Sequence, residues 1–348
     1  MGIAGEGTMR VIVANGSVIA VMIAVGAWMA QGPEARGQQA GQSRPESQAA
    51  PAPQVKQTSK EQFDRWMTQV SNWGRWGKDD QRGALNLITP AKRHQAAALV
   101  TTGTAVSLSR NVTPDKAADA RKQSGRLPPN GGSGLGNFFD AAEDPKVVDK
   151  YLAERQEVEY HGGRFTHVDA FCHAVHGGKI YGGLDYKQTV TKDGGCAKMG
   201  IAAMKDGVVT RGILLDMPGM QVFPQDIEAW EKRTGVKIGS GDALLLRTGK
   251  PAAKAGGWDP SIGPFLRARD VAVLGSDFYQ EGGSVPGVFL PIHSLTLFAL
   301  GVHLFDNLEL DALAETATKL KRWEFLLMAA PPPFANGAGS LINPIAVF

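Results

Sequence analysis

The chain has 348 residues, of which 43% are hydrophobic and 20% are charged. This content is ample for a buried core and excludes an intrinsically disordered chain. The 37 basic and 34 acidic residues leave a formal net charge of +3, too small and too evenly spread to indicate a nucleic-acid-binding surface. We therefore expect a globular protein that binds a small-molecule substrate and no nucleic acid.

The first thirty residues have the layout of a secretory signal peptide. Arg10 precedes a short apolar stretch, and a second apolar run ends near the small residues Ala27 and Ala30. The uninterrupted part of this run is shorter than the roughly 20 residues that span a bilayer. We expect residues 1–30 to be cleaved during export to the periplasm or the medium, with an uncleaved anchor as the alternative.

Residues 31–60 are rich in Gln, Pro, Ala and Ser and contain few large apolar side chains. Such a segment cannot bury enough surface to offset the entropy lost on ordering, so we expect a disordered linker. Residues 61–348 are expected to form one α/β domain. Cys172 and Cys196 are the only cysteines of the chain, and the sequence leaves open whether they form a disulfide.

The domain alternates between predicted helices and strands. Thr89 and Pro90 open a helix that runs to Val100, because Thr is a good N-cap and Pro is tolerated at the first helical position. The polar, glycine-rich stretch between about Pro114 and Asp149 predicts a long excursion near the functional site. Periodicity and β-branched runs predict further helices over residues 224–234 and 310–320, and strands over residues 209–215, 243–246, 271–274 and 325–330.

Four of the seven histidines lie within sixteen residues, at positions 161, 167, 173 and 176. On a strand, residues i and i+2 point to the same face, so His167 and Asp169 present an imidazole and a carboxylate side by side. This pair can hold a divalent cation. His173 reaches the same centre only if the strand turns near Phe171. A nitrogen and oxygen ligand set without thiolate favours Zn²⁺ or Mn²⁺.

The histidine cluster also has alternative interpretations. A buried histidine is often a core residue that is satisfied by hydrogen bonds, and His176, which precedes two glycines, is expected to be a solvated loop residue. Cys172 beside His173 suggests a thiol nucleophile, but neighbours on an extended segment point to opposite faces and are not aligned for catalysis.

The sequence Thr166-His167-Val168-Asp169-Ala170, with His173 four residues after Asp169, resembles the T-H-x-D-A-x-x-x-H signature of the bacterial cyclase family. Residues 178–183 resemble its G-K-x-Y-N-G signature. That family includes bacterial kynurenine formamidase and isatin hydrolase. Further similar segments lie at residues 73–86, 241–249, 275–277 and 337–346, so the resemblance extends from Trp73 to the C-terminus.

The resemblance implies a swivelling β/β/α-type domain with a mixed, barrel-like central sheet and outer helices. It also implies metal-dependent hydrolysis of an amide, formamide or lactone, in a protein that forms homo-oligomers. His167 and Asp169 are the implied metal ligands, and His173 is the implied acid/base residue. His293 and Asp306 match a second metal position in some members of the family. The resemblance thus implies one or two ions, and Asp169 would bridge them where there are two.

Three positions depart from the family pattern. Gly163 stands where the formamidases have a ligand histidine, and His161 is the candidate substitute. Phe171 replaces a proline. Asp306 replaces the usual glutamate, and His303 with Glu315 is a rival pair of similar spacing.

Two residues are candidates for substrate binding. Asp277 follows a predicted strand and could line the pocket or cap a turn, and Trp76 could wall an aromatic substrate.

Three functions fit these observations. The leading one is a metal-dependent hydrolase acting on C–N bonds of a small, aromatic or cyclic substrate. The second is a non-catalytic periplasmic protein that binds a small molecule or a metal. The third is a lyase or isomerase that uses the same metal and base.

Overall fold

The computed structural model describes residues 57–111, 135–141, 152–249, 256–278 and 280–348. The predicted signal peptide and most of the predicted linker lie outside the described residues, as does most of the predicted excursion between Pro114 and Asp149. None of the helices in the described part combines the length and the apolar character that crossing a bilayer requires.

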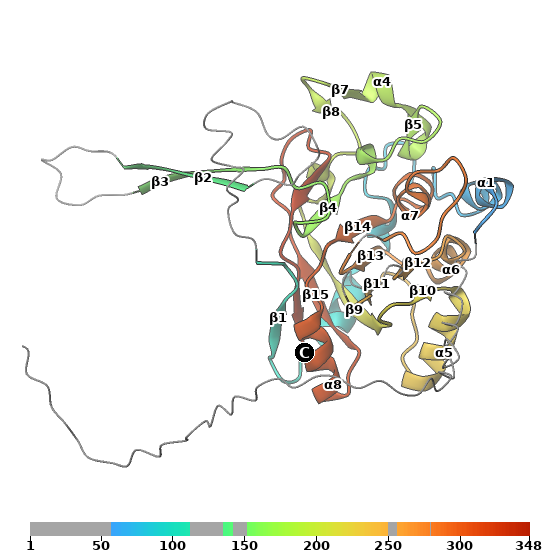
Figure 1. Ribbon diagram of the computed structural model, residues 1–348, viewed down its shortest axis with the longest axis vertical. Helices are drawn as coiled ribbons and strands as arrows, with labels where there is room; N and C mark the ends of the chain where they lie inside the picture. The colour runs from blue at the N-terminus through green and yellow to red at the C-terminus, as the bar shows by residue number, and fades with distance from the viewer. Residues whose placement is uncertain (1–56, 112–134, 142–151, 250–255, 279) are drawn as a thin grey trace, which may run out of the picture. The chain divides into compact units, whose positions relative to one another are not determined.

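A nine-stranded sheet that curls into a half-barrel forms the centre of the domain (Figure 1). In spatial order its strands are β1 (Ala105–Ser107), β17 (Ile345–Val347), β15 (Glu324–Ala329), β9 (Val208–Asp216), β11 (Ala243–Arg247), β13 (Val273–Ser276), β14 (His303–Asp306), β4 (His167–Asp169) and β16 (Gly339–Leu341). The four strands from β9 to β14 are parallel, and the other pairs are antiparallel. The sheet is therefore mixed, as predicted.

Burial explains why the central strands could be found from the sequence. The residues Ala243–Leu246 of β11 are completely buried, which is typical of a parallel strand covered on both faces. The predicted strands at 209–215, 243–246 and 325–330 are confirmed to within a residue at each end. The strand predicted at 271–274 begins two residues later, at Val273.

Helices cover the sheet. The α-helices are α1 (Lys60–Gln69), α2 (Pro90–Ala97), α4 (Tyr186–Thr189), α5 (Pro224–Thr234), α6 (Ile262–Arg269), α7 (Pro291–His293) and α8 (Asp311–Leu320). In α2 the Thr89 hydroxyl accepts a hydrogen bond from the Lys92 N–H at 3.2 Å, which confirms the predicted cap. The helix ends at Ala97 and not at Val100, because the amides of Leu99 and Val100 bond carbonyls only three residues back.

Shorter elements complete the described fold. The 3₁₀ helices are η1 (Gly83–Leu87), η2 (Phe171–His173), η3 (Tyr181–Gly183) and η4 (Ile201–Met204), and η5 (Ser294–Leu300) is a π-helix. Four two-stranded sheets pair β2 (Leu135–Ala141) with β3 (Leu152–Val158), β5 (Lys179–Ile180) with β6 (Leu184–Asp185), β7 (Val190–Thr191) with β8 (Gly195–Cys196), and β10 (Gln221–Val222) with β12 (Gly257–Trp258).

A disulfide joins Cys172 in η2 to Cys196 in β8, with 6.2 Å between the Cα atoms. It ties the turn that follows β4 to the β7–β8 hairpin. The sequence left this pairing open, and the structure supplies it. Because both sulfur atoms are bonded, the alternative interpretation of Cys172 as a thiol nucleophile is wrong.

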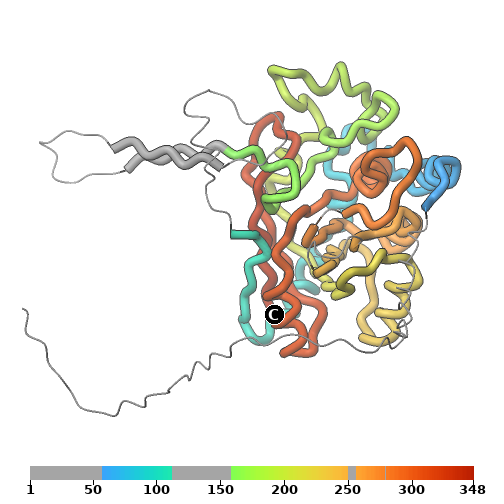
Figure 2. The backbone as a smooth tube through the Cα atoms, in the orientation of Figure 1, coloured from blue at the N-terminus to red at the C-terminus, as the bar shows by residue number. Residues whose placement is uncertain are grey.

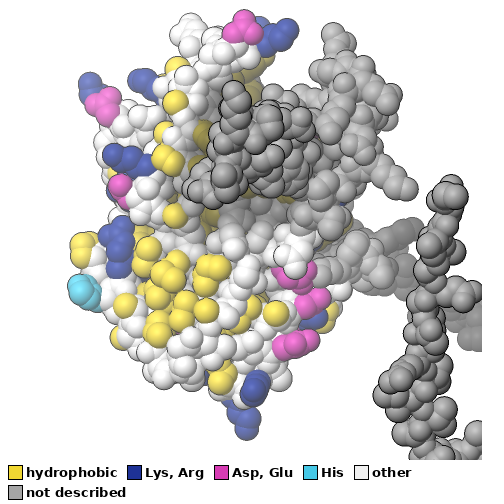
Figure 3. Space-filling model, turned by 90° about the vertical axis from the view of Figure 1, so that its left-hand side faces the viewer, with side chains coloured by type: hydrophobic (Ala, Val, Ile, Leu, Met, Phe, Trp, Pro, Cys, Tyr) yellow, Lys and Arg dark blue, Asp and Glu magenta, His cyan; other side chains and the backbone are white. Residues whose placement is uncertain are grey.

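Segments far apart in the chain lie side by side in the sheet. Figure 2 shows the C-terminal strands returning beside β1, where Ala346 pairs with Val106. Hydrophobic side chains gather on the lower half of the face seen in Figure 3. On the outer side of the sheet, Met328 of β15 is 37% exposed and pairs with the partly buried Ile345 of β17.

Candidate metal centre

The register of two strands builds the core of the centre. In β4, His167 and Asp169 point to the same face, as the i, i+2 spacing predicts. The neighbouring strand β14 is antiparallel and places Asp306 directly opposite His167, so its carboxylate lies on that face too. All three side chains are buried.

After β4 the chain turns in η2, as the metal hypothesis requires. The turn brings His173 back toward β4, with its Nε2 3.9 Å from Oδ2 of Asp169. The His173 side chain remains 32% exposed. A small molecule can therefore reach the His173 imidazole.

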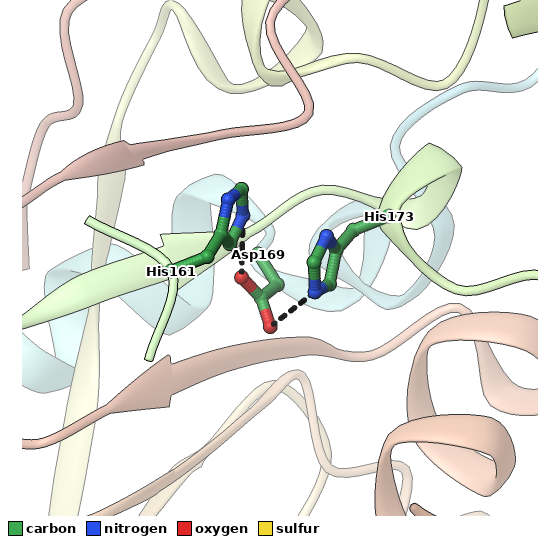
Figure 4. A group of neighbouring side chains, drawn as sticks. All are labelled: His161, Asp169 and His173. Carbon is green, nitrogen blue, oxygen red and sulfur yellow. Dashed lines mark ion pairs between the residues drawn. The ribbon is translucent and has the colours of Figure 1, made fainter. Parts of the chain in front are cut away.

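His161 lies beside His173, and the two rings stack with their centroids 4.1 Å apart (Figure 4). Its Nε2 is 3.3 Å from Oδ1 of Asp169, while His173 faces Oδ2. The loop that carries it is fixed by Asn307, whose side-chain amide donates to the Gly162 carbonyl at 2.6 Å. The carbonyl of Gly163 accepts a hydrogen bond from Arg110 at 2.9 Å. His161 thus reaches the centre from a position two residues before the one that the family pattern assigns to a histidine.

His293 completes the group from α7. Its Nε2 lies 3.2 Å from Oδ2 of Asp306 and 3.7 Å from Oδ2 of Asp169. The Nε2 of His167 lies 3.6 Å from Oδ1 of Asp169 and 3.9 Å from Oδ2 of Asp306. The structure therefore brings together all six residues that the sequence assigned to metal binding and acid/base chemistry.

Hydrogen bonds behind the centre orient two imidazoles. Nδ1 of His167 lies 2.8 Å from the Phe165 carbonyl, and Nδ1 of His293 lies 2.7 Å from a Glu281 carboxylate oxygen. Both partners are acceptors, so Nδ1 of each ring carries a proton and Nε2 faces the centre. This is the ring orientation that a metal ligand needs.

Buried polar atoms that form no hydrogen bond indicate that these side chains fit a cation. Both carboxylate oxygens of Asp169 and Nε2 of His161 are buried, and none of the described residues forms a hydrogen bond with them. Such atoms are costly unless something compensates them. Two sets of three residues could each hold an ion, because the donor atoms within each set lie within 4.8 Å of one another. Asp169 belongs to both sets. It is joined by His161 and His173 in one, and by His167 and Asp306 in the other. A divalent metal matches this donor chemistry.

The electrostatics of the centre keep the Asp169 carboxylate ionised. Burial would raise the pKa of Asp169, but the surrounding imidazoles, with His173 first, hold that pKa well below its usual range. Burial lowers the pKa of His173. Burial also opposes protonation of His293, yet Asp306 and Glu281 raise its pKa well above the usual value. The centre thus attracts positive charge.

The centre forms the floor of a cavity of about 550 Å³. The apolar part of its wall is formed by Phe278, Phe289 and Leu290. The Phe289 side chain is 93% exposed. A cavity of this size with a few convergent polar groups is typical of a small-molecule site.

Two predicted substrate-binding residues do not line this cavity. Asp277 is completely buried, and its carboxylate accepts hydrogen bonds from the backbone and hydroxyl of Thr248 and from the Gly249 amide. Its assignment to substrate binding is corrected to a structural role in the turn after β11. Trp76 packs partly buried against the core, with the Arg75 guanidinium 4.9 Å from its ring. It is not among the described residues that line this cavity, and its role in substrate binding stays a prediction.

The rival pair of His303 and Glu315 is not brought together. His303 is buried, its Nδ1 lies 2.9 Å from the Asp169 backbone carbonyl, and its ring stacks on Phe171 at 4.1 Å. Burial lowers its pKa to about 4. Glu315 is exposed on α8. His303 therefore supports the backbone of β4.

Several residues of the centre were missed by sequence reasoning. The Glu281 carboxylate accepts hydrogen bonds from the backbone amide and from Nδ1 of His293. The side-chain amide of Gln280 donates to the Asp306 carboxylate. Tyr160 packs against His161 at 4.4 Å and donates to the Gly339 carbonyl at 2.8 Å. The only signal for Glu281 in the sequence was its position twelve residues before His293, a predicted ligand. No local pattern distinguishes it from an acidic residue on the surface.

Comparisons with known proteins agree with the architecture. The model of the Cyclase family, described as "Putative cyclase", matches residues 88–280. No curated protein matches this chain. A crystal structure described as a novel cyclase is 26% identical and covers 80% of this chain and 99% of its own, with a TM-score of 0.67.

Two more distant structures are also similar. One is an isatin hydrolase bound to the product analogue thioisatinate, at 19% identity, covering 72% of this chain and 93% of its own, with a TM-score of 0.45. The other is described as a predicted metal-dependent hydrolase from Bacillus stearothermophilus. It is 15% identical and covers 70% of this chain and 97% of its own, with a TM-score of 0.42. The family model spans more than half of the 348 residues, so the chain belongs to the Cyclase family.

Proposed function

We propose that this chain is a metal-dependent hydrolase that cleaves an amide, formamide or lactone bond of a small substrate, in the manner of an arylformamidase. One observation carries the proposal: at the floor of a cavity, four imidazoles surround a buried carboxylate whose two oxygens form no hydrogen bond with the described residues. Membership of the Cyclase family supports it.

The donor atoms suit zinc or manganese, as one ion or two. The residues that would hold the metal are His161, His167, Asp169, His293 and Asp306. A divalent cation in such a site supplies a water of lowered pKa and polarises a carbonyl oxygen. Asp169 belongs to both donor sets, so it would help to hold one ion or two.

His173 is the residue that moves protons. Its imidazole is partly exposed to the cavity, whereas His167 and His293 are buried and held from behind. Burial lowers the pKa of His173, so at neutral pH its neutral form can accept a proton from water and deliver it to the leaving atom.

The apolar wall of the cavity suits a substrate that contains an aromatic or other planar ring. Phe278, Phe289 and Leu290 lie beside the charged floor, and aromatic side chains pack favourably against planar substrates. We therefore include aromatic and cyclic carbonyl compounds in the substrate class.

We further propose that the chain is exported and forms homo-oligomers. The first thirty residues support export, and the disulfide between Cys172 and Cys196 fits an oxidising compartment. N-terminal sequencing of the secreted protein and light scattering of the purified protein test these two expectations.

The function is tested with the purified chain loaded with Zn²⁺ or Mn²⁺ and offered para-nitroformanilide, isatin and a simple lactone. We expect hydrolysis of at least one compound, its loss after chelation, and incorporation of ¹⁸O from labelled water into the product. Turnover that survives metal depletion contradicts the proposal. Turnover without ¹⁸O identifies a lyase or isomerase, and no turnover unless Gly163→His and Asp306→Glu are introduced identifies a binding protein.

A further inference from the structure

The direction of the His173 ring depends on the backbone that carries it. The rings of His167 and His293 are each fixed by an acceptor behind Nδ1. The Nε2 of His173 lies 3.9 Å from Oδ2 of Asp169, and its ring stacks on that of His161. Neither of these two contacts is a hydrogen bond. The place where η2 holds residue 173 therefore largely decides where the imidazole points.

The turn η2 is too short to hold this backbone by itself. The N–H of His173 donates to the Ala170 carbonyl at 3.0 Å, and the N–H of Ala174 donates to the Phe171 carbonyl at 3.4 Å. Hydrogen bonds of a 3₁₀ turn have poor geometry, and a single helical turn is not stable alone. Contacts with other segments therefore stabilise η2.

The residue before His173 makes the strongest of these contacts. Cys172 is bonded through its sulfur to Cys196, and its N–H donates to the Met199 carbonyl at 3.1 Å. Both cysteines are buried. Because a disulfide keeps its two Cα atoms within about 7 Å of each other, it limits how far the backbone beside His173 can move.

The far end of the disulfide is itself attached to the domain. The N–H of Cys196 donates to the Asn336 carbonyl at 2.9 Å. Two residues further along the chain, the Ala338 carbonyl accepts a hydrogen bond from the Ala170 N–H at 3.0 Å. Residues 336–338 thus hold both the start of the η2 turn and the anchor of the disulfide.

From this geometry we propose that Cys172 and Cys196 are positioning residues, whose disulfide holds the η2 turn so that the His173 imidazole faces Asp169 and the cavity. The inference rests on the proposed function for the role of His173 in proton transfer. Without the disulfide the turn can move, and the imidazole is less often placed to exchange a proton with a bound substrate. A displacement of about 1 Å can cost an enzyme roughly 100-fold in rate.

The first test is the double variant Cys172→Ala/Cys196→Ala, which removes the disulfide and every thiol of the chain. Its kcat should fall by about tenfold or more while KM changes by less than about threefold, because His173 acts in the transition state and not in substrate binding. The assay uses whichever of the three compounds named above the wild type hydrolyses. Val190→Ala is the matched control, since Val190 pairs with Cys196 in the β7–β8 hairpin, and it should stay within about twofold of the wild type.

The second test opens and closes the disulfide in the unaltered chain. Dithiothreitol breaks the S–S bond, forms two protein thiols and becomes a cyclic disulfide, so atoms and electrons balance. The reductant is removed by gel filtration before the metal is loaded. Reduction should lower kcat as the double variant does, and oxidised glutathione should restore it. The double variant should respond to neither reagent.

A third measurement needs no activity. Diethyl pyrocarbonate modifies histidines, and peptide mass spectrometry gives the rate at each position of the metal-depleted chain. Loss of the disulfide should raise the rate at His173 by about threefold or more relative to the exposed His94, because a locally opened turn exposes its side chains. The buried His303 should stay protected, which shows that the domain remains folded.

An unchanged kcat or an unchanged modification rate of His173 after loss of the disulfide overturns the inference. If His303 of the double variant reacts as fast as His94, that variant is unfolded, and the reduced wild type decides the question. Absence of any hydrolysis in the wild type overturns the proposed function instead, and the modification rates then decide whether the disulfide holds His173.

Discussion

The imidazole rings of His161 and His173 lie parallel, with centroids 4.1 Å apart and planes within 3° of each other, and each faces a different oxygen of Asp169 (Figure 4). Two positively charged rings at this distance would repel each other. Burial lowers the pKa of His173, which favours the neutral imidazole that binds metal and accepts protons.

His161 is expected to be a metal ligand although it stands outside the family position. His161→Ala should weaken Zn²⁺ binding by more than about tenfold, since it removes a donor at the centre. His94→Ala is the control, because His94 is an exposed histidine on α2. Competition with a chromophoric chelator measures both variants. Equal affinity in His161→Ala and the control would show that His161 only packs against His173.

Glu281 is expected to position His293. Glu281→Ala removes the acceptor for Nδ1 of His293 and frees the ring to rotate, so metal affinity should fall by about 10- to 100-fold. Glu281→Gln keeps an acceptor and should lose less. Glu228→Ala, at an exposed acid of α5, should leave affinity unchanged. If Glu281→Gln and Glu281→Ala are both indistinguishable from the control, Glu281 has no such role.

Gly339 leaves the space into which His161 extends. A Cβ atom at this position would lie 2.6 Å from the Val168 carbonyl oxygen and 3.1 Å from Nε2 of His161. Gly339→Ala should therefore shift β16 or His161 and cost about 1 to 3 kcal/mol of unfolding free energy. At Gly239, an added Cβ has no neighbour within 4 Å, so Gly239→Ala is the control. Urea denaturation of both variants checks this, and equal stabilities would contradict the packing argument.

The pair of Arg75 and Asp270 should make stability depend on pH. The guanidinium donates to both carboxylate oxygens at 2.7 and 2.8 Å, and this lowers the pKa of Asp270. A lowered folded-state pKa gives stability that is present above the unfolded value of about 3.9 and is lost as the pH falls through the folded value.

The variant for this test is Asp270→Asn, because Asp270 has a φ of 53° and asparagine tolerates that conformation. Its Tm should lie below that of the wild type at pH 7, and the difference should shrink toward pH 3. Asp206→Asn, at an exposed acid, is the control. A difference in Tm that does not change with pH would mean that the carboxylate charge of Asp270 contributes nothing.

Local pattern was enough to predict much of the fold. The buried strands β9 and β11 and the capped helices α2 and α5 were found because their signals lie within a few neighbouring residues. The i, i+2 spacing of His167 and Asp169 likewise placed both side chains on one face.

Contacts between distant segments could not be found in this way. The placement of β4 between β14 and β16 depends on strand register across more than a hundred residues. Asp277 was misassigned because its hydrogen-bond donors come from Thr248 and Gly249, which follow a neighbouring strand. Glu281 became visible only when the fold placed it behind His293.

The most direct test of the metal centre is the metal content per chain, determined by mass spectrometry on protein purified without chelator. The account predicts one or two divalent ions per chain in the wild type, and a loss of at least one ion in both His167→Ala and Asp169→Ala, with folding checked by circular dichroism. A folded wild-type chain that binds neither Zn²⁺ nor Mn²⁺ under any loading condition, or variants that retain the full content, would contradict it.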